Sequence, residues 1–352
     1  DVEQPWSIAP LTWISAAGAS VLLTLWVFSR STDSPLVPRT QLSVAVRMVP
    51  IGLILLILVD PAGRVVADDL RHHAGDAQLD IAVAESASAT DSGGAGAFLQ
   101  AKQAEGELFR YFGYLAPDGP AFQGHEVFMR SDVLPLLANN RSMRLELYDI
   151  QGYDPAQIES YRSLFAALNG LERDYHEALV YPTGVMSPIL NLLNVRYILI
   201  PATAPTDRPD LRELLAAYPE VYRNDEVVVL ENEDALPRAW LVHDARYVNE
   251  DQGAQLLIDK AIDPQHTVLL LTSPPVLEPT PAESTEFVTV TVYSADRVQL
   301  NVSAASVGMV VLGDSYDPNW KVYVNGKRTD LYLANLALRG VVVPAGVSVV
   351  EF

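Results

Sequence analysis

Two long apolar runs near the start distinguish the chain from everything that follows. Residues 6–28 contain no charged side chain, and residues 42–59 contain one, Arg47. A helix needs about 20 predominantly apolar residues to cross the hydrocarbon core of a bilayer. The pattern therefore predicts two transmembrane helices, with Arg47 reaching back to the interface and Pro50 tolerated as a kink. A pair of buried helices in a soluble protein is the alternative.

The loop between these runs indicates their orientation. It carries Arg30 and Arg39 against one acidic residue, Asp33. Short loops rich in Lys and Arg stay on the cytoplasmic side of a membrane. We therefore expect residues 1–62 to form two spans joined by a cytoplasmic loop, and residues after about 60 to be extracytoplasmic. The acidic start "DVEQP" argues against a cleaved signal peptide.

Beyond the apolar runs, the pattern changes twice. Residues 63–99 include a Gly/Ser-rich stretch and are expected to be a flexible linker. Residues 100–282 alternate strand-like and helix-like segments, which predicts a mixed α/β domain. The strands are expected at 106–115, 143–150, 195–201, 226–232, 238–248 and 267–272. The helices are expected at 155–169, from 187 onward, at 209–218 and at 250–262.

The first of these helices has the clearest end signals. Asp154 is expected to be its N-cap and Pro155 to occupy the first helical position. Asn169 followed by Gly170 is a typical helix end, because glycine adopts the left-handed conformation at little energetic expense. The pattern therefore predicts one amphipathic helix between Asp154 and Gly170.

Residues 283–352 show no helical period. Short segments of alternating apolar and polar residues are separated by turn residues, and Asn325-Gly326 is a strong hairpin signal. This pattern predicts a C-terminal antiparallel β-sandwich, truncated because its last strand reaches the end of the sequence. The fold class expected for the chain is α+β, with two transmembrane helices, a mixed α/β domain and this sandwich.

Charge and cysteine content restrict the partners. The formal net charge is −20, and cysteine is absent. A strongly acidic chain is a poor partner for nucleic acid, whose phosphates need Lys and Arg. Without cysteine, the chain can form neither disulfides nor thiolate metal sites. The lipid bilayer is the first partner that the sequence predicts.

The segment 312–327 concentrates residues with binding chemistry. Asp314, Tyr316, Asp317 and Trp320 stand close together there. One interpretation is a turn followed by a strand that places Trp320 in the sandwich core. The other is a sugar site, because sugars stack on aromatic rings and their hydroxyls bond to carboxylates. A Ca²⁺ site using Asn319 is conceivable, but no calcium-loop pattern is present, so no metal ligand is predicted.

The loop that precedes the predicted helix is the second candidate. Asp149, Gly152, Tyr153 and Asp154 lie between a predicted strand and a helix N-terminus, where free N–H groups favour anions. A lipid-linked phosphate or a sugar is the ligand that we expect there. The structural alternative is a turn in which Asp154 caps the helix and Gly152 supplies a positive φ angle.

The remaining polar groups give weaker signals. The histidines are dispersed, and the sequence contains no GxSxG, no HExxH and no phosphate-binding glycine loop. His243-Asp244 lies in a predicted strand without an apparent nucleophile. The pairs His72-His73 and His125-Glu126, and the single residues His176 and His266, have no metal-binding spacing.

Five motifs occur in an order that carries a resemblance: "LYDIQGYDP", "LLNVRYILIP", "DALPRAWLVHDARYV", "VVLGDSYDPNWKVYVNGK" and "ALRGVVVPAG". Together they resemble the extracytoplasmic C-terminal part of the bacterial YfhO membrane protein family, over roughly residues 100–352. The resemblance implies a polytopic glycosyltransferase of the GT-C type in the bacterial cell membrane. Such enzymes move a sugar from a polyprenyl-phosphate carrier to an envelope acceptor such as teichoic acid.

The resemblance also implies what this sequence lacks. The catalytic carboxylate of such enzymes lies in an early outward loop, so we expect this chain to be a fragment and assign no catalytic residue. No cofactor is evident, although a divalent cation remains open for the full-length enzyme. The part present is expected to recognise the acceptor or carrier glycan. A non-catalytic scaffold and a secreted hydrolase are the two alternatives.

Overall fold

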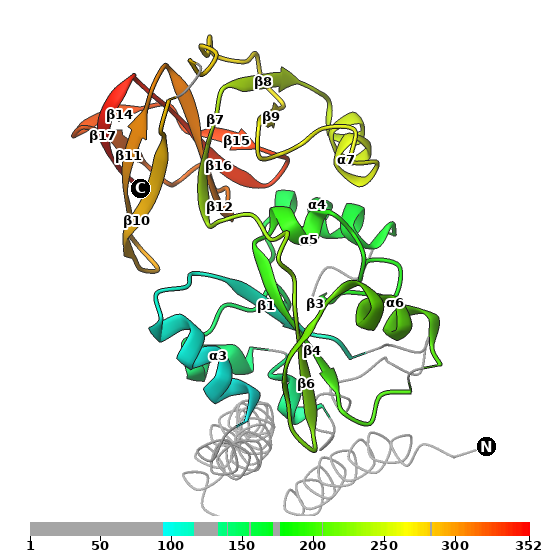
Figure 1. Ribbon diagram of the computed structural model, residues 1–352. Helices are drawn as coiled ribbons and strands as arrows, with labels where there is room; N and C mark the ends of the chain where they lie inside the picture. Colours follow the sequence, from blue (N-terminus) through cyan, green and yellow to red (C-terminus); the bar gives the residue numbers. More distant parts are fainter. Residues whose placement is uncertain are drawn as a thin grey trace, which may run out of the picture. The chain divides into compact units, whose positions relative to one another are not determined.

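The computed structural model describes residues 94–115, 133–138, 140–154, 156–171, 177–205, 207–281 and 284–352 (Figure 1). All of them belong to one compact unit, residues 79–352. The predicted spans at 6–28 and 42–59 lie outside these ranges, as does most of the predicted linker at 63–99. Within the described ranges, every helix is too short or too polar to cross a bilayer.

A four-stranded sheet forms the first half of the described chain. Its strands lie in the order β1 (Arg110–Gly113), β4 (Val195–Pro201), β6 (Val227–Glu231) and β5 (Glu220–Arg223). The pair β1–β4 is parallel and the other pairs are antiparallel. Alternate residues of β4 enter two different apolar cores, because a strand places successive side chains on opposite faces. The sheet is therefore buried on both faces.

Helices cover this sheet. Helix α3 (Ala95–Ala104) contacts β5 and β6, while α4 (Glu159–Asn169), α5 (Ile189–Leu192) and α6 (Pro209–Ala217) contribute to the other core (Figure 1). The predicted end of α4 is confirmed, with Gly170 at φ 67°. Its predicted start is wrong, because the helix begins at Glu159. The Asp154 carboxylate instead accepts the N–H of Ala156 at 2.8 Å.

The strand predicted over 143–150 is also wrong. Residues Arg141–Leu145 form the 3-10 helix η4, bounded by Asn140 at φ 66° and Glu146 at φ 54°. Two left-handed residues turn the backbone away from an extended path. The only strand-like contact left is an isolated bridge between Tyr111 and Asp149. Immediately after it, β2 (Gly152–Tyr153) pairs with β3 (Glu177–Ala178).

The second half is a sandwich of two sheets that share an apolar core. The five-stranded sheet has the order β10-β11-β17-β13-β14, and the six-stranded sheet has the order β7-β12-β16-β15-β9-β8. All its pairs are antiparallel except β8–β9. The strands of the first sheet are β10 (Phe287–Tyr293), β11 (Val298–Ala304), β17 (Gly346–Glu351), β13 (Val322–Val324) and β14 (Lys327–Thr329). The second sheet's later strands are β12 (Gly308–Ser315), β15 (Tyr332–Ala334) and β16 (Leu338–Val343).

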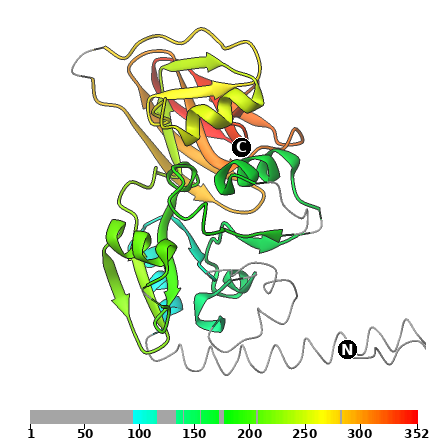
Figure 2. The ribbon, with the colours of Figure 1, turned by 90° about the vertical axis from the view of Figure 1, so that its right-hand side faces the viewer.

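The single strand predicted over 238–248 is two strands. Strand β7 (Ala239–Val242) pairs with β12, and β8 (Asp244–Tyr247) pairs with β9 (Thr267–Leu270). The chain thus leaves one edge of the six-stranded sheet at His243 and enters the opposite edge. Helix α7 (Glu250–Ile258) follows and packs against this sheet (Figure 2). The predicted domain boundary at residue 282 consequently separates β7, β8 and β9 along the chain from the other three strands of the same sheet.

The hairpin signal is confirmed. Asn325 and Gly326 have φ angles of 52° and 77°, which fits a two-residue turn with both central residues left-handed. They join β13 to β14 in a tight antiparallel pair.

Candidate functional site

The segment 312–321 folds as a turn between β12 and β13. The side chain of Asp317 accepts the N–H of Asn319 at 2.8 Å, and its carbonyl accepts the N–H of Trp320 at 3.1 Å. An aspartate followed by proline and asparagine commonly forms this kind of turn. The structural interpretation of the segment is thus confirmed for Asp317. Tyr316 is half-buried, and its N–H bonds to the carbonyl of Ala337.

Trp320 is half-buried at the margin of the sandwich core, where it contacts the apolar cluster without being enclosed by it. The next residues alternate as predicted, since Lys321 is exposed and Val322 is buried. Trp320 lines two cavities, of about 540 and 760 Å³, to which we refer as the rim cavity and the tyrosine cavity. The residue is therefore accessible from two sides.

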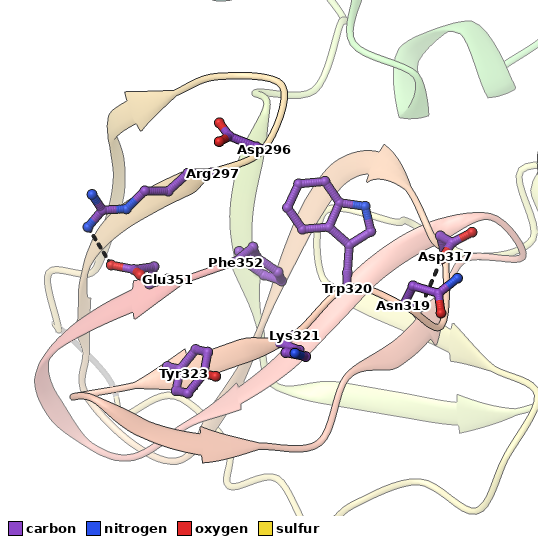
Figure 3. Close-up of a pocket in the computed structure, with 9 residues that line it drawn as sticks. All are labelled: Asp296, Arg297, Asp317, Asn319, Trp320, Lys321, Tyr323, Glu351 and Phe352. Atoms are coloured by element: carbon purple, nitrogen blue, oxygen red, sulfur yellow. Dashed lines mark hydrogen bonds and ion pairs between the residues drawn. The ribbon is translucent and has the colours of Figure 1, made fainter.

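The rim cavity has polar walls on both sides of the indole. Asp317 and Asn319 lie on one side, and the ion pair between Arg297 and Glu351, at 2.6 Å, lies on the other (Figure 3). Tyr323 of β13 and Phe352, which follows β17, also line it. Such a mixture of aromatic rings with several hydrogen-bonding groups suits a polyhydroxylated ligand.

The tyrosine cavity lies between the turn and the loop before β2. Its walls include Tyr148 and Tyr293, whose rings meet edge to face at 5.3 Å between centroids. Asp314 and Arg339 contribute the charged part of the wall, and Glu146 is an exposed acidic residue there. Its volume is in the range typical of small-molecule sites.

Arg339 holds the indole in place. Its guanidinium carbon lies 3.8 Å from the centroid of the Trp320 ring, and its Nε donates to the carbonyl of Ser315 at 2.9 Å. A guanidinium stacked on an aromatic face is attracted by the ring quadrupole. One face of Trp320 is thus occupied by a cation.

Asp314 is the centre of a buried ion-pair cluster. Its Oδ1 accepts from Arg110 Nη2 at 2.8 Å, from Arg238 Nη1 at 3.4 Å and from the Tyr293 hydroxyl at 2.8 Å. Burial favours the neutral acid, but Arg110 and then Arg238 outweigh it and lower the pKa of Asp314. Burial, followed by repulsion from Arg110, lowers the pKa of Arg238 to about 10. The Oδ1 atom of Asp314 therefore already accepts hydrogen bonds from protein donors and is not positioned to accept one from a sugar hydroxyl.

The predicted loop site forms a third cavity of about 280 Å³. Asp149, Gly152 and Asp154 line it, together with Tyr161 and Ser315. Tyr153 lies next to them in β2, where its backbone pairs with Glu177. Among the described residues that line this cavity there is no Lys or Arg. A phosphate would meet two carboxyl groups there, so the cavity fits a neutral or cationic group better.

Asp149 is unusual in this loop. Its Oδ1 accepts the N–H of Gln151 at 2.9 Å, whereas its Oδ2 is shut off from solvent and meets no hydrogen-bond partner within the described ranges. Parts of the residue remain accessible, but burial of the carboxyl group raises its pKa well above the ordinary value. Burial thus disfavours the charged form of this side chain.

Gly152 serves a different purpose from the expected one. Its φ angle is not positive, which corrects the prediction. A Cβ atom at this position would lie 2.6 Å from Oδ1 of Asn140. The glycine therefore leaves room for the Asn140 side chain and does not supply a special backbone conformation.

A serine, a histidine and a glutamate meet elsewhere in the fold. His243 Nε2 lies 3.1 Å from Glu286 Oε1, and His243 Nδ1 lies 3.2 Å from the Ser306 hydroxyl. However, Nδ1 is only 2.8 Å from the carbonyl of Glu278, which accepts hydrogen bonds and cannot donate one. Nδ1 must therefore carry a proton, so it cannot take one from Ser306. These contacts hold the segment around Glu278 in place and do not form a nucleophile–base pair.

Among the residues that the structure describes, the other metal and histidine candidates do not form a metal site. Asp314 is engaged by Arg110 and Arg238, and Asp317 is engaged by the turn that contains Asn319. Over the ranges that the structure describes, no three His, Asp or Glu side chains meet in a way that could hold a metal ion. His266 contacts Asp263 on the surface. The residues His72-His73, His125-Glu126 and His176 lie outside the described ranges.

Five residues of this region escaped sequence reasoning: Tyr148, Arg110, Arg238, Tyr293 and Arg339. They come from five separate segments, and no local spacing indicates that they meet. Comparisons with protein-family models, with curated proteins and with solved structures each returned no match. Function must therefore be inferred from the residues and their geometry.

Proposed function

We propose that this chain is the extracytoplasmic C-terminal part of a polytopic glycosyltransferase of the bacterial cell membrane. In this proposal its described part recognises the glycan of a polyprenyl-phosphate carrier or of an envelope acceptor. Two apolar runs at 6–28 and 42–59 and the five ordered motifs that resemble the YfhO family support the membrane context. Catalytic residues, and any divalent cation, are assigned to another part of the enzyme.

The observation that carries the proposal is the position of Trp320. Its indole is shared by two cavities, held on one face by Arg339, and flanked by Asp317 and Asn319. Sugars bind by placing apolar C–H faces on aromatic rings and by directing hydroxyls to carboxylate and amide groups. A ring that is already immobilised loses little conformational entropy when the ligand binds.

A partner-docking scaffold is the second candidate, because one face of the sandwich carries exposed apolar side chains. Phe287, Val347 and Val349 are 51%, 76% and 39% exposed on the five-stranded sheet. Phe287 and Val347 both pair with Ser303, so the two side chains lie in one row across the sheet. Exposed apolar groups in such an arrangement are typical of protein contact surfaces.

The test measures glycan binding to the full chain in detergent micelles. Envelope polysaccharides and their monosaccharides are titrated against the wild type, Trp320→Ala and the control Tyr247→Ala, which removes an exposed aromatic residue from β8. We expect Trp320→Ala to weaken binding about tenfold, corresponding to about 1.4 kcal/mol, and Tyr247→Ala to have little effect. Absence of binding to every polymer, with all variants folded, would favour the scaffold.

The membrane context has its own test. The chain is expected to stay in the pellet after alkaline carbonate extraction, and external labelling of intact cells should reach the exposed Lys327. Extraction by carbonate, or labelling only after the cells are opened, would contradict the predicted topology.

A further inference from the structure

The charge around the tyrosine cavity is not balanced. Arg110, Arg238 and Arg339 all act on the single carboxylate of Asp314. Three guanidinium groups opposite one carboxylate leave two positive charges in excess in a region with little access to water. Glu146 at the cavity wall is exposed, and Asp317 also acts on Arg339, so each offsets only part of this excess.

Two of the arginines also have hydrogen-bonding capacity that the protein does not use. Arg339 is 6% exposed and Arg238 is 2% exposed. Nη1 of Arg339 and Nε of Arg238 are buried and have no hydrogen-bond partner among the residues that the structure describes. Native proteins rarely leave a donor of a charged group unsatisfied, because its burial without a partner is unfavourable. Both atoms are themselves enclosed, so they show unused donor capacity beside the cavity, and a ligand reaches Nη1 of Arg339 only after a shift of that side chain.

The cavity beside Arg339 has the size and walls to hold that ligand. It measures about 760 Å³, and Arg339 forms part of its wall with Tyr148, Tyr293 and Trp320. Arg238 lies behind the two tyrosines, 5.3 Å from the centroid of each ring. A ligand in the cavity would meet the guanidinium of Arg339 directly and the positive potential of Arg238 through the aromatic wall.

We propose that the tyrosine cavity binds an oxyanion carried by a sugar, a carboxylate or a phosphate, with Arg339 as the pairing cation. The guanidinium presents parallel N–H donors that match both groups. The sugar ring would lie against Tyr148 and Trp320. The sugar part of this ligand rests on the proposed glycan recognition, whereas the oxyanion part is testable by itself.

The experiment is calorimetric titration of the full chain in detergent micelles with four probes: glucose, glucuronate, glucose 6-phosphate and inorganic phosphate. We expect glucuronate or glucose 6-phosphate to bind at least tenfold more tightly than glucose. The comparison between these two acids decides between carboxylate and phosphate. Equal affinity for glucose and for both acids would overturn the oxyanion site while leaving glycan recognition intact.

Variants of Arg339 locate the site. Arg339→Gln should weaken binding of the favoured acid about tenfold to a hundredfold, as expected for loss of a charge-assisted hydrogen bond. Arg339→Lys should keep part of the affinity. The matched control is Arg328→Gln, which removes the same charge from an exposed position on β14 and should change nothing. Unaltered binding by folded Arg339→Gln would contradict the proposal.

The inorganic phosphate probe separates the two proposals. Phosphate binding that depends on Arg339, without binding of any sugar, would support the oxyanion site and argue against glycan recognition. If Arg339→Gln does not fold, the wild type still decides the matter. Millimolar phosphate or glucuronate should then raise its unfolding temperature above that in chloride of equal ionic strength, and no rise with either would overturn the proposal.

Discussion

Arg110 and Asp314 form an ion pair at 2.8 Å although 204 residues separate them along the chain. Arg110 lies on β1 of the four-stranded sheet, and Asp314 lies on β12 of the six-stranded sheet. Arg238, next to β7, reaches the same carboxylate and also donates to the carbonyl of Phe109 at 3.1 Å. This cluster thus fastens the two halves of the described chain to one another through buried charges.

Asp314→Asn should destabilise the protein strongly. The substitution leaves two buried guanidinium groups without their common counter-ion, an effect of about 3–5 kcal/mol in comparable buried pairs. Urea unfolding followed by circular dichroism would measure the loss, with the exposed Asp330→Asn as control. A loss below about 1 kcal/mol would contradict the role assigned to the cluster.

The ion pair between Arg110 and Asp314 also predicts that the stability of the protein depends on pH. The pKa of Asp314 is lower in the folded state than in the unfolded chain, so the folded state binds this proton less tightly. The stabilisation is therefore complete above about pH 4, near the unfolded pKa, and is lost as the pH falls below it. The stability difference between the wild type and Asp314→Asn should shrink on acidification over that interval. A difference that stays constant down to pH 2 would argue against a charged Asp314.

Asp149 predicts a pH dependence of stability with the opposite sign. Its pKa is raised in the folded state, so the unfolded chain releases this proton at lower pH than the folded protein does. Its contribution to stability therefore declines as the pH rises above about 4, the value for an unfolded aspartate. Asp149→Asn removes the ionisation and should make the protein more stable than the wild type at pH 7, without an advantage at pH 3. Thermal unfolding of both proteins at pH 7 and pH 3 measures this difference in stability.

A matched control for Asp149 lies in the same loop. Asp154 is exposed, and its replacement by Asn preserves the turn contact with Ala156. Asp154→Asn should therefore show no gain at pH 7. If Asp149→Asn is less stable than the wild type at neutral pH, the carboxyl group is charged and has a partner outside the described residues.

Asn169 is expected to be a structural residue. Its Nδ2 donates to the carbonyl of Leu179 at 2.9 Å, and its Oδ1 accepts the N–H of Tyr181 at 2.8 Å. Asn169→Leu removes both bonds inside a buried site and should lower the free energy of unfolding by about 2–3 kcal/mol. Asn301→Ala, at an exposed position on β11, should change it by less than about 0.5 kcal/mol. Chemical denaturation compares the two, and equal effects would refute the assignment.

Ser306 should not react as a nucleophile. A fluorophosphonate probe labels serines activated by a neighbouring base, and the protonated Nδ1 of His243 offers none. We expect the wild type to remain unlabelled under conditions that label trypsin. Covalent labelling that disappears in Ser306→Ala would restore the hydrolase alternative.

The sequence predicted elements well where short-range patterns determine them. Alternation in 297–304 buries Val298, Leu300 and Val302 on one face, and the Asn325-Gly326 turn fixes the adjacent hairpin. Prediction from the sequence failed where backbone geometry or packing against distant residues determines the structure. Asp154 can cap a helix or an isolated turn with the same chemistry, and only tertiary contacts select the turn.

The candidate site was partly predictable for a similar reason. Trp320 and Asp317 were identified because they stand in one short segment. The arginines were not, because Arg110, Arg238 and Arg339 meet only after two sheets have formed. A buried polar network of this type is determined by topology and has no period along the chain.

The crossing of the chain at His243 from one edge of the six-stranded sheet to the other affects the choice of fragments for expression. The segment after residue 282 resembles a separable module, but three partners of its sheet, β7, β8 and β9, are encoded upstream. Expressed alone, residues 283–352 would leave β12 and β15 with unpaired edges and uncovered apolar surface, which promotes aggregation. A fragment intended for crystallisation or glycan arrays should therefore begin before β1.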